Sequence, residues 1–326
     1  MKVLVTGASG FVGKSLCEKL FRQGYAVRAA MRASNIQSES IEQVVVGSID
    51  GNTDWSAALH DIDLVIHLAA RVHVMKESSD NPIEEFRKVN VHGTENLARQ
   101  AARAGVKRLV FISSIKVNGE DTLTFTEDGG SQHSFSESDN PKPQDSYGVS
   151  KWEAEQVLHC VAQETGLEVV IVRPPLVYGV GVKGNFAQML KALAKGIPLP
   201  LASVHNLRSL VYVENLVDAL ILCATHPKAA GQTYLVSDGG DVSTPDLLRQ
   251  LGDAMGHPAR LFPCPASLLK LGGRLLGKSD QIERLLGSLQ VDSRKIRREL
   301  GWQSPFTLHH GLRASAVEYS DANQDS

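Results

Sequence analysis

The stretch KVLVTGASGFVG at residues 2–13 decides the fold of the N-terminal part of the chain. Residues 3–6 form an apolar run that predicts a strand, and an amphipathic helical pattern follows the stretch. Between them, Gly7, Gly10 and Gly13 let the backbone turn sharply, so that helix N–H groups can approach a bound phosphate. A glycine triplet alone is as typical of a tight turn. Its place directly between a strand and a helix favours a pyrophosphate site, although the spacing GxxGxxG differs from the GxGxxG of many dehydrogenases.

Short apolar runs alternate with helical patterns along the first half of the chain. We predict strands at residues 3–6, 26–31, 43–46, 64–68, 108–113 and 169–173. We predict helices at residues 13–22, 83–104 and 150–164. Such alternation indicates the α/β fold class, with a Rossmann-type doubly wound parallel sheet whose strands are covered on both faces.

The pattern changes after about residue 179. Gly, Pro and Lys punctuate shorter segments there, and strands are predicted only at residues 210–213 and 233–236. We therefore predict a dinucleotide-binding Rossmann domain over residues 1–178. Residues 179–326 would form mainly a smaller C-terminal substrate lobe, with some segments returning to the main sheet.

The composition is that of an ordinary globular protein, with 326 residues, of which 42% are hydrophobic, and a formal net charge of −2. This charge offers no general attraction to nucleic acid polymers. The four cysteines lie far apart without a CxxC pair, so we expect neither a metal site nor a disulfide framework. The N-terminus reads as a strand rather than a signal peptide, and no apolar run approaches the ~18 residues of a membrane span. These features predict a cytoplasmic protein.

The end of the second predicted strand bears on which dinucleotide binds. An acidic residue there would accept both adenosine ribose hydroxyls and repel a 2′-phosphate. The sequence instead has Met31 and Arg32, and the guanidinium of Arg32 could clamp a 2′-phosphate. We therefore favour NADP(H), with NAD(H) as the alternative; a solvent-facing Arg32 at a strand end explains the residue equally well. Asp50 follows the third predicted strand and is a candidate acceptor for the adenine amino group.

Tyr147 and Lys151 lie four residues apart in the sequence YGVSK, which places both on one face of a helix. A tyrosine pKa near ~10 is too high for an efficient base at neutral pH, and a nearby ammonium lowers it. The YxxxK spacing alone also arises by chance in surface helices. Ser114 supplies a third group, because it follows an apolar strand at the edge where open α/β sheets place their ligands. The adjacent Ser113 competes with it, since strand alternation directs one of the two toward the site.

Asn90 lies within the apolar stripe of the helix predicted over residues 83–104. The stripe consists of apolar side chains at helical spacing, Ile83, Phe86, Leu97 and Ala101. The Asn90 amide is therefore expected to be buried and hydrogen-bonded. A structural role is the commoner explanation for such a residue, and a catalytic one, holding a water behind Lys151, is the alternative.

Together these residues resemble the extended short-chain dehydrogenase/reductase family of the NAD-dependent epimerase/dehydratase type, especially its UDP-sugar 4-epimerases and 4-keto-reductases. The resemblance spans nearly the whole chain through the segments GASGFVG, HLAA, NVHGTENL, FISSIKVNG, YGVSK, VRPPLVYG and NLRSLVYVENLVDA. It implies that Ser114, Tyr147 and Lys151 are the catalytic trio and that the HLAA loop passes beside the cofactor. The full set of predicted cofactor contacts is Gly7, Gly10, Phe11, Val12, Gly13, Arg32, Asp50, Leu68, Ala69, Ala70, Tyr147, Lys151 and Pro174.

The resemblance also implies where the substrate binds, alongside Ser114. Arg208 matches the arginine that contacts the nucleotide diphosphate in many nucleotide-sugar members, and a guanidinium suits that bidentate task. Asn185 is a weaker candidate for the same diphosphate. A surface loop residue is the plainer explanation for both, and we favour the functional one for Arg208.

Departures from the family pattern narrow the chemistry. The sugar 4,6-dehydratases carry an Asp-Glu pair after the catalytic hydroxyl, where this chain has Ile115 and Lys116, so a dehydratase is not expected. Met31 replaces the acidic residue typical of the NAD-retaining 4-epimerases. Asn118 replaces a tyrosine common at its position, and the sequence offers no interpretation of it.

We therefore predict redox chemistry at carbon 4 of a nucleotide sugar. The leading prediction is a UDP-4-keto-hexose reductase that consumes NADPH in surface-polysaccharide precursor synthesis. The alternative is a UDP-hexose 4-epimerase with bound NAD. More remote alternatives are a reductase of a hydrophobic ketone and a non-catalytic NADP(H)-sensing module. The resemblance also implies a homodimer formed through a four-helix contact.

Overall fold

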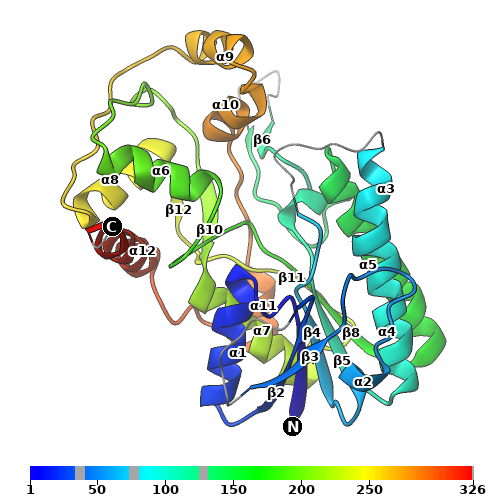
Figure 1. The fold of residues 1–326 in the computed structure, drawn as a ribbon. Helices are drawn as coiled ribbons and strands as arrows, with labels where there is room; N and C mark the ends of the chain where they lie inside the picture. The colour runs from blue at the N-terminus through cyan, green and yellow to red at the C-terminus, as the bar shows by residue number, and fades with distance from the viewer. Residues whose placement is uncertain (34–40, 73–80, 125–130, 325–326) are drawn as a thin grey trace.

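A seven-stranded parallel sheet forms the centre of the protein (Figure 1). The computed structural model describes residues 1–33, 41–72, 81–124 and 131–324. The strands follow the spatial order β11-β8-β5-β4-β1-β2-β3, and every neighbouring pair is parallel. The predicted doubly wound parallel sheet is thereby confirmed. The strands are β1 (Lys2–Thr6), β2 (Ala26–Met31), β3 (Glu42–Val45), β4 (Leu64–His67), β5 (Arg108–Ile112), β8 (Glu168–Arg173) and β11 (Thr233–Leu235).

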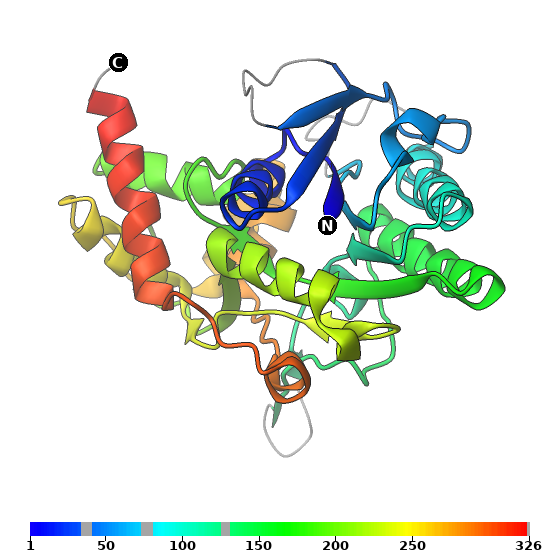
Figure 2. The ribbon, with the colours of Figure 1, turned by 90° about the horizontal axis from the view of Figure 1, so that it is seen from below.

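Helices cover both faces of this sheet, as the view from below shows (Figure 2). One face carries α1 (Phe11–Arg22) and α7 (Val213–Thr225), which pack against each other. The other face carries α4 (Gly93–Arg103) and α5 (Ser146–Thr165), which also pack together. Successive residues of β1 enter two different hydrophobic cores, one on each face. This double burial is why the strands read as continuous apolar runs. Two short helices, α2 (Ser56–Leu59) and α3 (Pro82–Arg87), complete the second face.

A smaller lobe stands at the carboxyl ends of these strands (Figure 1). It contains a three-stranded sheet of order β12-β10-β9 and is built mostly from the second half of the chain. Not every late segment belongs to it, because β11 pairs with β8 and α7 packs on the main sheet. The remaining elements are β6 (Leu123–Thr124), β7 (Ser131–Gln132), β9 (Leu176–Tyr178), α6 (Asn185–Ala194), β10 (Arg208–Tyr212), β12 (Asp241–Val242), α8 (Thr244–Ala254), α9 (Ala266–Leu275), α10 (Ser279–Leu286), α11 (Arg294–Leu300), α12 (Leu308–Gln324) and the 3₁₀ turns η2 (Ile115–Val117) and η3 (Pro227–Ala229).

All three predicted helices differ from their predicted boundaries, and α1 begins at Phe11, two residues earlier than expected. The helix predicted over residues 83–104 is interrupted by a π-helical turn, η1 (Lys88–His92), between α3 and α4. α5 begins at Ser146, because the Asp145 side chain accepts the Gly148 N–H at 2.7 Å and caps the helix there. Tyr147 consequently lies in the first turn of α5. The short strands β9 and β12 were not predicted, since two or three residues carry no periodicity.

Candidate active site

The turn between β1 and α1 leaves no space for side chains at its glycine positions. Gly7 has a φ of 69°, and a Cβ there would lie 2.8 Å from the Ala69 nitrogen. A Cβ on Gly13 would lie 2.2 Å from the carbonyl oxygen of Gly7. Gly10 donates its N–H to that same oxygen at 2.9 Å. The turn can therefore close only where these positions lack a Cβ atom.

The N-terminus of α1 follows this turn with no side chain capping it. Gly10 is the N-cap, and Phe11 and Val12 are half-buried in the first turn of the helix. A helix of twelve residues directs a partial positive charge and free N–H groups at its start. The glycine turn and this helix end, which we call the glycine cradle, therefore fit the pyrophosphate of a dinucleotide.

The segment that follows β4 lies directly beside the glycine cradle. Thr6 Oγ1 is 2.6 Å from Nδ1 of the buried His67 and accepts the Ala69 N–H at 3.2 Å. His67 Nε2 is 3.0 Å from Thr94 Oγ1. Burial lowers the pKa of His67 to about 3, so the ring is neutral and fixes the segment by hydrogen bonds. The predicted cofactor contacts of this segment thus lie next to the turn: Leu68, Ala69 and Ala70.

Substitution Gly13→Ala is expected to weaken dinucleotide binding by about tenfold or more, because the added methyl group would displace the Gly7 carbonyl and open the turn. Isothermal titration of the purified variant measures this loss. Gly272→Ala is a matched control, since a Cβ there meets no atom within 4 Å. Equal affinity of the parent and the Gly13→Ala protein would contradict the assignment of the cradle.

The structure separates the two adjacent serines after β5. The hydroxyl of the buried Ser113 donates to a carboxylate oxygen of Glu155 beneath the sheet edge. Ser114 is only partly buried, and its Oγ accepts the Lys116 N–H at 3.3 Å at the start of η2. The Ser113 hydroxyl is thus committed to Glu155, which favours Ser114 as the hydroxyl available to a ligand, and the catalytic role of Ser114 stays a prediction.

Substitution Ser114→Ala is expected to lower kcat by about 10²-fold, the usual effect of removing one hydrogen-bond donor to a reacting oxygen. Ser113→Ala serves as the neighbouring comparison, because it removes a hydroxyl that is committed to Glu155. Its effect is expected mainly on the melting temperature. Steady-state kinetics and thermal unfolding of both variants distinguish the two; the reverse pattern would assign the catalytic hydroxyl to Ser113.

Lys151 and Tyr147 meet the same edge of the sheet. The buried Lys151 Nζ donates to the Ile112 carbonyl at 2.7 Å and lies 4.3 Å from the centroid of the Phe111 ring. A Cβ on Gly148 would lie 3.0 Å from the Lys116 carbonyl oxygen. The first turns of α5, which carry Tyr147 and Lys151, thus pack directly against the segment that carries Ser114.

Burial shifts the pKa values of Tyr147 and Lys151 in the chain itself. Burial, together with the charge of Asp145, raises the pKa of the Tyr147 phenol. Burial lowers the pKa of Lys151 to about 7, and Glu155 opposes this shift. In the chain alone, therefore, burial favours the neutral form of both side chains.

A buried ion pair that sequence reasoning missed supports this edge from below. Arg173, at the end of β8, donates through Nε to Glu155 Oε1 at 2.9 Å and through Nη2 to the other carboxylate oxygen. Its Nη1 donates to Asn118 Oδ1 at 3.0 Å, and Asn118 Nδ2 donates to the Ser136 carbonyl at 2.8 Å. Asn118 is thus a structural link from β8 to the loop after η2. The available signal was Glu155 itself, four residues after Lys151 on α5.

Substitution Glu155→Gln is expected to move the alkaline limb of the kcat/KM pH profile to lower pH. The Glu155 carboxylate raises the pKa of Lys151, and the ammonium is lost as pH rises through that pKa. Removing the carboxylate lowers the pKa, so the ammonium disappears at lower pH. The test is to measure kcat/KM across the pH range in buffers of constant ionic strength. A limb that stays in place or moves upward would contradict the role of Glu155.

Asn90 is buried, as predicted, and lies in the π-helical turn η1. Its Oδ1 accepts the Arg71 N–H at 2.8 Å, and its Nδ2 donates to the Arg71 carbonyl and to Ser150 Oγ, each at 3.0 Å. Ser150 in turn donates to the Tyr147 carbonyl at 2.8 Å. Asn90 thus joins the segment after β4 to the first turn of α5. Its Nδ2 donates to two acceptors and its Oδ1 accepts from a third group, which supports a positioning role.

The remaining predicted cofactor contacts lie at the same edge. Arg32 is exposed just after β2, and Met31 before it is buried. Asp50 accepts the Asn52 N–H at 2.9 Å, which leaves its other carboxylate oxygen outside that turn. Pro174 is buried after β8, and its carbonyl accepts the Ile115 N–H at 3.0 Å. Their contacts with a dinucleotide stay predictions.

The two predicted substrate residues lie in the smaller lobe. Arg208 begins β10, and its Nη1 donates to the carbonyl oxygens of Arg284 and Gly287 at the end of α10. Burial and the neighbouring Arg284 lower the pKa of Arg208. Asn185 is exposed at the first position of α6. Binding of a diphosphate by either residue stays a prediction.

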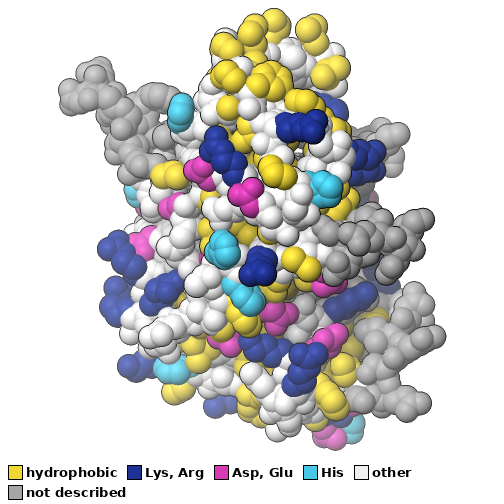
Figure 3. All heavy atoms as spheres, turned by 90° about the vertical axis from the view of Figure 1, so that its left-hand side faces the viewer, with side chains coloured by type: hydrophobic (Ala, Val, Ile, Leu, Met, Phe, Trp, Pro, Cys, Tyr) yellow, Lys and Arg dark blue, Asp and Glu magenta, His cyan; other side chains and the backbone are white. Residues whose placement is uncertain are grey.

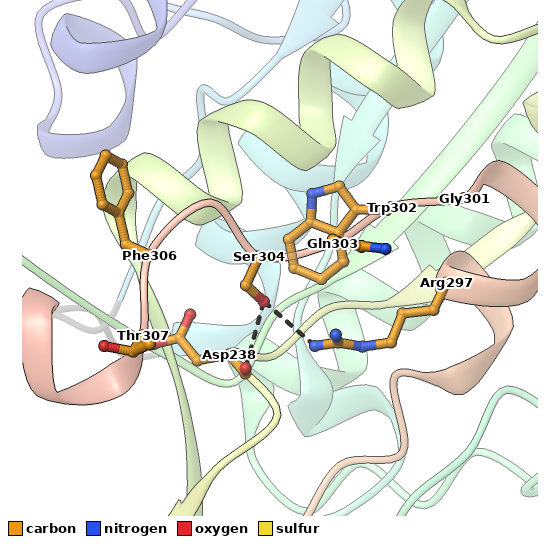
Figure 4. Close-up of a pocket in the computed structure, with 8 residues that line it drawn as sticks. All are labelled: Asp238, Arg297, Gly301, Trp302, Gln303, Ser304, Phe306 and Thr307. Atoms are coloured by element: carbon orange, nitrogen blue, oxygen red, sulfur yellow. Dashed lines mark hydrogen bonds between the residues drawn. The ribbon is translucent and has the colours of Figure 1, made fainter.

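A pocket of about 540 Å³ lies elsewhere, between the turn after β11, α11 and the segment before α12 (Figure 4). In it the Arg297 guanidinium donates to Ser304 Oγ at 3.2 Å, and that hydroxyl donates to the Asp238 carbonyl at 3.3 Å. None of the predicted site residues lines this pocket. The candidate active site therefore rests on the glycine cradle and the trio, not on the pocket lined by Asp238, Arg297, Gly301, Trp302, Gln303, Ser304, Phe306 and Thr307.

The doubly wound sheet, the glycine cradle and the placement of Ser114, Tyr147 and Lys151 define an enzyme of the extended short-chain dehydrogenase/reductase type. The chain belongs to the NAD dependent epimerase/dehydratase family, whose model matches residues 3–237. The resemblance read from the sequence is thereby confirmed.

Similar proteins cover almost the whole chain. It is 45% identical over 323 residues to a UDP-glucose 4-epimerase of Vibrio cholerae, across 98% of this chain and 96% of that protein. It is 27% identical over 338 residues to an N-acetyl-alpha-D-glucosaminyl-diphospho-ditrans,octacis-undecaprenol 4-epimerase of Escherichia coli O157:H7, across 99% of this chain and 97% of that protein. The fold is similar to that of a UDP-glucose 4-epimerase of Thermotoga maritima crystallised with UDP-glucose, with a TM-score of 0.78, 24% identity and coverage of 99% and 100% of the two chains.

Proposed function

We propose that the protein is a 4-epimerase of a UDP-hexose that works with a retained NAD. The observation that carries the proposal is the packing of the start of α5, with Tyr147 and Lys151, against the segment that carries Ser114 at the carboxyl edge of the sheet. The Vibrio cholerae relative, a UDP-glucose 4-epimerase at 45% identity, supports the epimerase over the NADPH-consuming reductase that the sequence analysis put first.

The proposed reaction divides the work among the three side chains. The bound dinucleotide supplies the acceptor, and later the donor, of the hydride at carbon 4. Tyr147 takes the proton of the carbon-4 hydroxyl, while Ser114 hydrogen-bonds to the same oxygen. Lys151 stabilises the phenolate by its charge. After the sugar has turned in the site, Tyr147 returns the proton to the oxygen, which completes the epimer.

For the substrate diphosphate we propose the guanidinium of Arg208. Its Nη1 is held by two carbonyl oxygens, and a guanidinium has further N–H donors for a phosphate. Burial, and to a lesser extent Arg284, lowers the pKa of Arg208, and an anion bound beside it would favour its charged form. Asn185 is proposed as a second contact. A hydrophobic ketone would have no use for this charge.

The carrier of the sugar is part of the proposal. The Escherichia coli relative is named for a lipid-linked diphospho-sugar rather than a UDP-sugar. Both carriers offer the same diphosphate to Arg208. We propose UDP as the carrier, on the strength of the relative with the higher identity, and treat the lipid carrier as an arm of the test. Surface-polysaccharide precursor synthesis fits either carrier.

A second candidate is the NADPH-dependent 4-keto-reductase. The observation that favours it is Arg32, exposed after β2 where an acidic residue would otherwise bind the adenosine ribose. In that reaction Tyr147 would donate a proton to the carbon-4 oxygen, and NADPH would be consumed stoichiometrically. A non-catalytic NADP(H)-sensing module is the remaining alternative, and it requires none of the trio.

The test is incubation of the purified protein with UDP-glucose or UDP-galactose, without added dinucleotide, followed by separation of the two epimers. Epimer exchange, with NAD released on denaturation, supports the proposal. NADPH oxidation with a UDP-4-keto-hexose, and no epimer exchange, would assign the reductase instead. Exchange only with a polyprenyl diphospho-sugar would change the carrier. No turnover with any of these substrates would support the sensing module.

We also propose a homodimer and a cytoplasmic location. The four cysteines are free thiols in the structure, as a reducing compartment would keep them: Cys17, Cys160, Cys223 and Cys264. The exposed surfaces of α4 and α5 are the expected dimer contact. Analytical ultracentrifugation gives the oligomeric state, and a monomeric active enzyme would remove the dimer from the proposal.

A further inference from the structure

Helix α9 leaves an apolar surface uncovered at the end of the smaller lobe. Its inner side is anchored by the buried Leu269 and Gly273, and a Cβ on Gly273 would lie 2.8 Å from Ile282 of α10. Figure 3 shows hydrophobic side chains gathered at the top of the molecule, where Figure 1 places α9. The exposed leucines there, which we call the leucine tip, have 57%, 53%, 79% and 73% of their surface accessible: Leu268, Leu271, Leu275 and Leu276.

The spacing of the leucine tip follows the helix. Leu268, Leu271 and Leu275 lie three and four residues apart, so they share one face of α9. Leu269 and Gly273 occupy the opposite face, which is buried. An amphipathic helix of a globular protein normally turns its apolar face inward and its polar face to water. α9 instead presents an apolar face in both directions, and nothing else in the described residues covers the outward one.

Positive charge borders the leucine tip. Lys270 and Arg274 are exposed one helical turn apart on α9, and Lys278 is exposed just after it. No Asp or Glu occurs at residues 254–279, whereas four Lys or Arg do. This segment is therefore strongly basic, although the chain as a whole carries a net charge of −2. Its natural counterpart is a surface that is both apolar and anionic.

A second copy of the chain is a poorer counterpart. A ten-residue helix is about 15 Å long, whereas a stable protein interface takes roughly 20–30 residues from each side. A two-fold contact would bring this patch of each copy together, so that Lys270 and Arg274 of both copies would crowd into one small interface. The segment offers no carboxylate to pair with them.

We propose that the leucine tip docks on an anionic phospholipid surface. The leucines would enter the boundary between headgroups and acyl chains, and Lys270, Arg274 and Lys278 would reach the lipid phosphates. Among the described residues no helix is both long and apolar enough to cross a membrane, so α9 would lie on the surface. The docked segment leads into α10, whose end holds Arg208, and thus joins the smaller lobe to the membrane. This proposal does not depend on the proposed reaction.

The test is co-sedimentation of the full chain with vesicles of phosphatidylglycerol and phosphatidylcholine. We expect binding that weakens with added salt and is largely absent with phosphatidylcholine alone. The double substitution Leu271→Ser and Leu275→Ser should reduce the bound fraction by about fivefold or more. Val317→Ser is the matched control, because Val317 is a large apolar residue of α12 with 42% exposure outside the tip.

Thermal unfolding shows whether the double variant remains folded, as expected for exposed positions. If it does not, Lys270→Glu with Arg274→Glu is the second variant, and its binding should also be lost. Equal binding of the parent and the folded variants would overturn the proposal. So would an absence of binding to the anionic vesicles. Dimers that form in solution and are lost with the leucines, without vesicle binding, would assign the leucine tip to a second copy.

Discussion

Replacing Tyr147 by phenylalanine is expected to lower turnover by about 10²- to 10⁴-fold, the usual contribution of a positioned acid–base group. The substitution removes only the phenol oxygen. The ring stays in edge contact with Phe86, at a centroid distance of 6.2 Å, and the helix cap at Asp145 does not involve it. In the described residues the phenol oxygen has no hydrogen-bond partner, so its loss leaves no orphaned group. The expected loss is therefore chemical rather than structural.

The measurement is single-turnover conversion, together with dinucleotide affinity and melting temperature. Both of the latter should match the parent protein. Tyr234→Phe is the matched control. The Tyr234 hydroxyl donates to Glu299 of α11 at 3.2 Å, and among the described residues it has no hydrogen bond with a member of the trio. Its turnover should stay within about twofold of the parent. Undiminished turnover by the Tyr147→Phe protein would remove the acid–base role, and with it the epimerase and the reductase alike.

The fold was predictable because its decisive signals are local. A strand buried on both faces must be apolar throughout, and a turn that closes on the Gly7 carbonyl must omit Cβ atoms. Both requirements can be read from residues that are adjacent in the sequence. The same holds for Tyr147 and Lys151, since helical spacing alone places them on one face. The short strands of the smaller lobe escaped because they are held by partners far away in the sequence.

The support beneath the site could not be predicted for the same reason. The contact that commits the Ser113 hydroxyl joins it to Glu155, and the two residues lie 42 positions apart in the sequence. Asn90, in the π-helical turn, accepts the Arg71 N–H and donates to the Ser150 hydroxyl. No periodicity within one helix would indicate these two contacts. Arg208 matched a motif, yet its contacts with the end of α10 depend on the arrangement of the smaller lobe.

Replacing Glu155 by alanine is expected to destabilise the protein by about 3–5 kcal/mol, because it leaves a buried charge without its partner. The Arg173 side chain is 6% exposed and that of Glu155 is fully buried, so water cannot take the place of the carboxylate. Ser113 loses its acceptor in the same step. The expected fall in melting temperature is about 4–7 °C, because the unfolding entropy of a chain of 326 residues is large. Glu164→Ala is the control, since its ion pair with Arg99 is half exposed and should change the melting temperature little.

The loss of stability in the Glu155→Ala variant should come from the unpaired charge of Arg173 rather than from the lost hydrogen bonds. Replacing Glu155 and Arg173 together by methionine should therefore recover a large part of the stability, because no unpaired charge remains in the core. The double variant would still lack the Arg173 contact with Asn118, and with it the link to the loop after η2. Its turnover should consequently stay below that of the parent although it is folded. If the free energy of unfolding of the Glu155→Ala variant lay within about 1 kcal/mol of the parent value, water or a moved side chain would have to stabilise the Arg173 charge. The edge that carries Ser114 would then be positioned by α5 and η2 alone.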